Sequence, residues 1–228
     1  DSKTKYFGVN SIATGVGSNV NGDGAIGAGS LAVGIFNKAS GLGANTVGLE
    51  NQALGLASNA FGTTNTADST GQSQNFLTGT LTGANAFGNW NTASGAVSTA
   101  VGIKNKASGT ASSAFGIATT ANKKGAIAFA GWYDQNADNQ IDDASLTASE
   151  TAAATGVSSV AIGAGVSATA DRSSVFGVGS QATALNATAI GFDSLADEAN
   201  TISVGRAGAE KRITNVATPT KATDAANK

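Results

Sequence analysis

The stretch from residue 25 to residue 62 reads AIGAGSLAVGIFNKASGLGANTVGLENQALGLASNAFG, and its regularity decides the fold. A glycine occupies every seventh position from Gly27 to Gly62, and the same spacing returns from Gly88 to Gly116. In the last third of the chain the spacing doubles, from Gly163 to Gly205. A short period that runs through most of a chain indicates stacked structural repeats that form one continuous core.

The repeating unit has two unequal halves. The residue before the glycine alternates between a large apolar side chain, as at Val33, Val47 and Phe61, and a small, polar or aliphatic one, as at Ser40 and Leu54. The unit is therefore about 14 residues long, and each half fits a short strand followed by a glycine-assisted turn. The pattern predicts an all-β, stacked β-roll of about 11 or 12 such coils.

Strand alternation assigns the large apolar residues and the alanines to opposite faces of each strand. Val160 and Ile162 share one face, for example, and Ala161 lies on the other. We expect the large side chains to fill the interior of the roll, and the alanine rows to face outward and allow close approach of another chain. A second interpretation is that alanine merely fits a crowded turn. The expected interior residues are Leu31, Val33, Val47, Phe61, Phe87, Val101, Phe115, Phe129, Val160, Ile162, Phe176 and Ile190.

The composition excludes several classes of protein. The 228 residues are 41% hydrophobic and only 12% charged, which is unlike a disordered chain. The net charge of −2 offers no basic surface for nucleic acid. Cysteine is absent, so stacking rather than disulfides must stabilise the fold. No run is long and apolar enough for a membrane span, and no signal peptide is expected at the start.

Two segments interrupt the period. The first, near residues 63–84, is polar but contains Phe76, Leu77 and Leu81. These side chains either pack back on the roll or contact a ligand, because rigid scaffolds often carry their binding residues on loops.

The second interruption, near residues 132–156, begins with Trp132 and Tyr133 and continues with an acidic run. Oxygen-bearing side chains at alternate positions are typical of a calcium loop, although Asn139 replaces the turn glycine and Ser145 the last glutamate. The alternative is a solvated acidic loop. The candidate calcium ligands are Asp134, Asn136, Asp138, Gln140 and Asp142.

The repeats also resemble a known family. Ser158–Gly163 and Asn186–Gly191 are similar to the N-S-V-A-I-G units of YadA-like heads, and 200–205, 212–217 and 223–225 are similar to the neck that follows them. Such heads belong to the trimeric autotransporter adhesins of Gram-negative bacteria. The resemblance implies a left-handed parallel β-roll head over 1–199, assembled as a homotrimer, and a neck over 200–228 that leads to a coiled-coil stalk.

The tail supplies the candidate neck contacts. Ile213 and Val216 have helical rather than strand spacing, and we expect them to face the trimer axis. The resemblance also implies a location on the bacterial surface, with an outer-membrane anchor in a C-terminal region outside this sequence.

Three functions follow from these observations. The first is a virulence-related adhesin head that attaches to host extracellular matrix or to a host cell-surface glycoprotein, with the two interrupting segments as the contact sites. The second is a structural spacer or self-association module. The third, an enzyme acting on polysaccharides, is disfavoured because the chain has no His and no Cys. We expect no enzyme, no required cofactor and no nucleic-acid partner.

Overall fold

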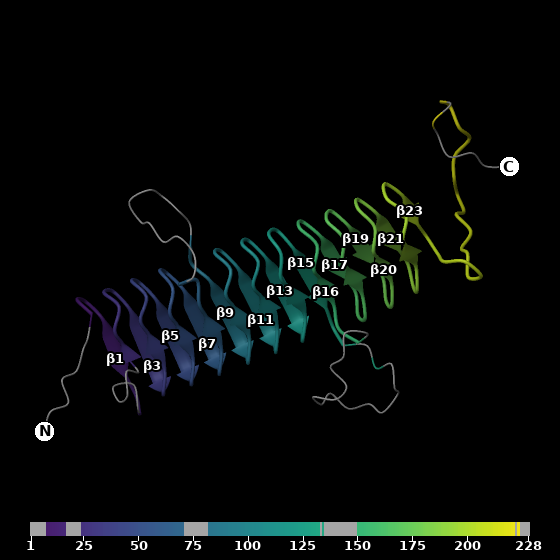
Figure 1. The fold of residues 1–228 in the computed structure, drawn as a ribbon. Coiled ribbons are helices and arrows are strands. Elements are labelled where there is room, and N and C mark those ends of the chain that lie inside the picture. Colours follow the sequence, from purple (N-terminus) through teal and green to yellow (C-terminus); the bar gives the residue numbers. More distant parts are fainter. Residues whose placement is uncertain are drawn as a thin grey trace, which may run out of the picture.

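The chain forms a parallel β-solenoid in the computed structural model, which describes residues 8–16, 24–70, 82–132, 134, 150–221 and 223. Figure 1 shows the coils stacked along one axis, with two sheets running the length of the stack. The first sheet has 12 strands and the second has 11, and all neighbouring strands in them are parallel. No helix occurs in the described ranges. The predicted all-β parallel roll with a repeat of about 14 residues is confirmed.

The first sheet contains the longer strands: β1 (Ile12–Thr14), β3 (Leu31–Ile35), β5 (Asn45–Leu49), β7 (Asn59–Thr63), β9 (Asn85–Asn89), β11 (Thr99–Ile103), β13 (Ser113–Ile117), β15 (Ile127–Ala130), β17 (Val160–Ile162), β19 (Ser174–Phe176), β21 (Thr188–Ile190) and β23 (Ile202–Ser203). The second sheet contains two-residue strands: β2 (Gly24–Ala25), β4 (Lys38–Ala39), β6 (Gln52–Ala53), β8 (Thr66–Ala67), β10 (Thr92–Ala93), β12 (Lys106–Ala107), β14 (Thr120–Ala121), β16 (Ala153–Ala154), β18 (Ser167–Ala168), β20 (Gln181–Ala182) and β22 (Leu195–Ala196).

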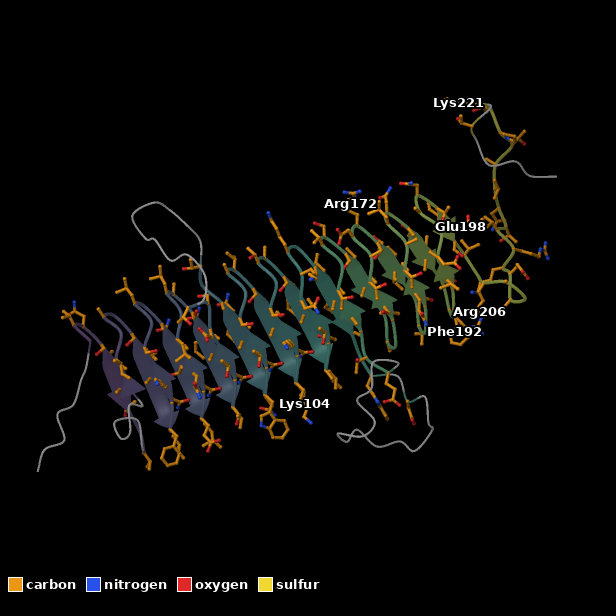
Figure 2. The ribbon with its side chains drawn as sticks, in the orientation of Figure 1. Lys104, Arg172, Phe192, Glu198, Arg206 and Lys221 are labelled. Carbon is orange, nitrogen blue, oxygen red and sulfur yellow. The ribbon has the colours of Figure 1, made fainter. Side chains whose placement is uncertain are left out.

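Each coil turns at two corners. The first corner follows the strand of the first sheet, and the second corner follows the strand of the second sheet. Lys104 and Phe192 mark the first corner along one edge of the solenoid, and Arg172 and Glu198 mark the second corner along the opposite edge (Figure 2). The register is kept across both interruptions, since Phe61 pairs with Phe87 and Phe129 pairs with Ile162.

The expected interior was assigned to the wrong face. Alanine fills the space between the sheets: Ala100 and Ala114 on the first sheet and Ala107 and Ala121 on the second are completely buried. The residues expected inside point outward instead, and Phe129 is 57% exposed. This correction applies to Leu31, Val33, Val47, Phe61, Phe87, Val101, Phe115, Phe129, Val160, Ile162, Phe176 and Ile190, which are half-buried or exposed.

The reason is the width of the roll. A 14-residue coil with strands of five and two residues encloses a narrow interior, and its largest fully buried side chains are Val166 and Val175. A phenylalanine or isoleucine at the inward position would force the sheets apart, and overpacking is itself destabilising. The alanine rows therefore form the core and do not provide an outer contact surface.

Glycine lets consecutive coils approach closely at the corners. A Cβ atom on Gly48 would lie 2.0 Å from the carbonyl oxygen of Gly62, in the next coil, and the φ of Gly48 is +123°. Gly43 also has a positive φ, +65°, but nothing lies within 4 Å of the place its Cβ would take. Close packing of coils therefore requires glycine at Gly48, whereas Gly43 serves only the turn.

We predict that Gly48→Ala lowers the free energy of unfolding by about 3 kcal/mol, from steric overlap and backbone strain together. The matched change Gly43→Ala should cost only ~1 kcal/mol, because it adds strain without overlap. Thermal or denaturant unfolding checks both variants. Equal losses would show that contact between coils is not what selects glycine at Gly48.

A ladder of buried asparagines lines the first corner from inside the roll. From Asn51 onward, each asparagine side chain donates to the carboxamide oxygen of the asparagine in the preceding coil, and Asn91 Nδ2 lies 2.9 Å from Asn65 Oδ1. The same Nδ2 donates to Phe87 O and Gly102 O at 2.9 and 2.7 Å, so the amide ties two successive corners together. The ladder consists of Asn37, Asn51, Asn65, Asn91 and Asn105, and it ends at Thr119.

We predict that Asn91→Asp destabilises the fold by about 3 kcal/mol at neutral pH, because a buried carboxylate would face three acceptor oxygens. Since the charged form is penalised, the introduced carboxyl has a raised folded-state pKa. The loss should therefore be small below the unfolded pKa of ~4 and grow as the pH rises. Unfolding measured across pH tests this, with the exposed change Asn89→Asp as control. A loss that does not depend on pH would contradict the account.

Candidate binding surface

An unbroken apolar column runs along the outer face of the first sheet. Its members pair in register from coil to coil, so each side chain stacks on the next: Val33, Val47, Phe61, Phe87, Val101, Phe115, Phe129, Ile162, Phe176 and Ile190. The rings of Phe61 and Phe87 are stacked with centroids 5.3 Å apart, and those of Phe115 and Phe129 lie 5.8 Å apart. Monomeric soluble proteins rarely expose long contiguous apolar surfaces, so this outer apolar column has the character of a contact surface.

A polar column lies beside the apolar one on the same strands. Asn45 Nδ2 donates to Asn59 Oδ1 at 2.8 Å, and Asn59 Nδ2 donates to Asn85 Oδ1 at 2.8 Å. Thr99 and Ser113 continue this column in the next coils. This column is polar only from Asn45 to Ser113, because Leu31 precedes it in register and Ile127 and Val160 follow it.

The two interrupting segments leave the roll at opposite corners. The first departs after Thr70 and returns at Thr82, at the second corner. The second departs after β15, at the first corner, and returns before β16. Most of the residues predicted to bind a receptor or calcium lie outside the described residues: Phe76, Leu77, Leu81, Tyr133, Asn136, Asp138, Gln140 and Asp142.

Trp132 and Asp134 are the two predicted site residues of the second segment that the structure describes. Trp132 is half-buried, and its indole Nε1 is shielded from solvent without a hydrogen-bond partner in the described structure. Asp134 is engaged in an interaction. Among the described residues no three carboxylate, His or Cys side chains come together as a metal site, and the calcium loop stays a prediction.

The C-terminal tail is joined to the last coil by polar contacts. Arg206 Nη2 lies 2.9 Å from Asp193 Oδ2, and Lys211 Nζ donates to the Phe192 carbonyl and to Ser194 Oγ. The backbone N–H of Gly208 lowers the pKa of Glu210, with the residue's own N–H as a second cause. These charged contacts fix where the tail leaves the roll.

The two predicted neck residues lie further along the tail. Ile213 is 66% exposed and Val216 is half-buried. The part of the tail that the structure describes contains no helix, and the contact of these two side chains with a trimer axis stays a prediction.

Sequence reasoning missed the side chains of the first corner. Phe36, Trp90 and Lys104 come two residues after the corner glycine, all with positive φ, and Trp90 is 55% exposed. Lys104 Nζ lies 5.5 Å from the centroid of the Trp90 ring. Each of the three residues lies two positions after a glycine of the repeat, and the sequence shows this spacing. It does not show that the strand ends there and that the chain turns a corner.

Comparison with protein families identifies the repeat. The model of the YadA head domain repeat (2 copies) matches residues 8–26, 25–44, 107–129, 154–180, 168–194 and 182–206. No curated protein matches the chain. Within the described residues, no helix is long and apolar enough to cross a membrane. Heads built from this repeat belong to adhesins and are typically not enzymes. The chain carries the β-solenoid head of a YadA-like trimeric autotransporter adhesin.

Proposed function

We propose that this chain is the adhesive head of a Gram-negative surface protein and attaches the cell to host extracellular matrix or to a host cell-surface glycoprotein. The observation that carries the proposal is the run of YadA head repeats over a continuous β-solenoid. In this proposal the roll is left-handed, the tail beyond residue 200 is the neck of a coiled-coil stalk, and a C-terminal region outside this sequence anchors the protein in the outer membrane.

The head functions as a homotrimer in this proposal, with the outer apolar column as the subunit contact. The column is half-exposed in the single chain and spans ten coils. Burial of such side chains stabilises an interface by ~25 cal/mol per Å² of apolar surface. A closed three-fold arrangement would cover the column in every subunit at once.

The trimer is tested with Phe115→Glu, which places a charge in the middle of the column. Because a carboxylate buried in an apolar contact is strongly disfavoured, the variant should fall to monomer mass in light scattering while its circular dichroism stays that of a β-protein. Thr120→Glu on the outer face of the second sheet is the matched control and should stay trimeric. A wild-type monomer, or a trimeric Phe115→Glu variant, would reject this interface.

A receptor is proposed to engage one or both interrupting segments rather than the repeats. The repeats present similar small polar residues from coil to coil, whereas the segments add aromatic and aliphatic side chains of the kind favoured in interface cores. Calcium bound by Asp134, Asn136, Asp138, Gln140 and Asp142 would order the second segment.

Two excisions test the loops, one joining Thr70 to Gly83 and the other joining Gly131 to Gly156. Both should keep the trimer, and at least one should lose binding in a screen of matrix proteins and glycoprotein receptors, by about tenfold or more. Chelation should weaken binding through the second segment without lowering the melting temperature. Undiminished binding in both excisions would favour the repeats. The absence of any receptor, together with association between heads, would favour the spacer or self-association role.

A further inference from the structure

The first corner keeps bulky side chains in a strained backbone conformation. Residues two positions after the corner glycine have φ between 51° and 56° in six consecutive coils, and none of them is glycine: Phe36, Glu50, Thr64, Trp90, Lys104 and Ala118. In two later coils the same position is Gly165 and Gly179. Glycine would adopt this conformation without strain. Left-handed residues other than glycine also occur at the second corner, as at Val97 and Arg172, so what distinguishes the first-corner row is its exposed aromatic side chains.

The row carries two exposed aromatic residues. Phe36 and Trp90 are 47% and 55% exposed and are separated by three coil steps, from β3 to β9. Parallel neighbouring strands lie ~4.8 Å apart, so the two aromatic positions are about 14 Å apart along the axis.

Apart from Ala118, the other residues of the row are polar, and their charges balance. Glu50 and Thr64 lie between Phe36 and Trp90, and Lys104 is the next residue of the row after Trp90, with its ammonium near the indole ring. Protein interfaces usually have a contiguous apolar core from which charged residues are depleted. Isolated rings that alternate with hydrogen-bonding groups are a poor match for such a core.

A linear glycan matches this arrangement better. A pyranose has an apolar C–H face that stacks on an aromatic ring, and hydroxyl groups at its rim that bond to Glu, Thr and Lys side chains. Because Glu50 and Lys104 carry opposite charges, this row has no preference for an acidic polymer.

We propose that the first-corner ridge, formed by Phe36, Glu50, Thr64, Trp90 and Lys104, binds a linear uncharged glycan laid along the solenoid axis. Trp90 is its central stacking platform. The ridge belongs to the repeat scaffold, so this inference does not depend on the interrupting segments binding a receptor.

The experiment uses the full chain and immobilised N-acetyllactosamine oligomers of increasing length, with heparin as the acidic comparison. Binding should strengthen with oligomer length, and intrinsic tryptophan fluorescence should change on binding. Trp90→Gly should weaken binding by about tenfold or more without lowering the melting temperature, because it removes the ring and relieves the backbone. Trp90→Phe should retain most of the binding.

Val97→Gly is the matched control. Val97 is also exposed, apolar and left-handed, with φ of 57°, but it lies at the second corner. It should bind like the unsubstituted chain. The proposal is overturned if no oligomer binds, if heparin alone binds, or if Trp90→Gly binds undiminished. It is also overturned if Trp90→Gly changes the oligomeric state, since the ridge would then be a subunit contact.

Discussion

The rest of the structure depends on how closely one coil lies on the next at the glycine positions. A methyl group at Gly48 or Gly102 would reach 2.0 Å from a carbonyl oxygen of the following coil. This contact fixes the glycine spacing, and with it the path of a coil of about 14 residues. Inside so small a coil there is room for Ala, Ser and Asn but hardly for anything larger.

A narrow interior reverses the usual distribution of side chains. Large hydrophobic residues cannot be buried within one chain, so they stand on the outer face of the first sheet, where only another molecule can cover them. Polar side chains occupy part of the interior instead. The amides of the asparagine ladder donate hydrogen bonds to neighbouring asparagines and to backbone carbonyls at the corner. Within a single chain of this kind, hydrogen bonds along the axis join each coil to the next.

The sequence was sufficient for the period and the strands, because glycine spacing and alternation encode them directly, and the family resemblance added the parallel stacking. It was misleading on which face is inside, since alternation separates Val160 and Ile162 from Ala161 without saying which set is buried. That choice depends on the width of the coil, which only the positions of both corners reveal. The asparagine repeat from Asn37 to Asn105 is visible in the sequence, but the burial of its amides and their bonds to one another are not.

The first corner is built in two ways. From Asn37 to Asn105 a buried amide ties each corner to the next, and in these coils the left-handed position holds Phe, Glu, Thr, Trp or Lys. Where Val166 and Ser180 replace the asparagine, the left-handed position is Gly165 and Gly179. The ladder is not what permits other residues at this position, because Asp193 is left-handed beside Ser194. The left-handed side chains are exposed at Phe36, Glu50 and Trp90, so they can differ from coil to coil while the amides inside the corner stay the same.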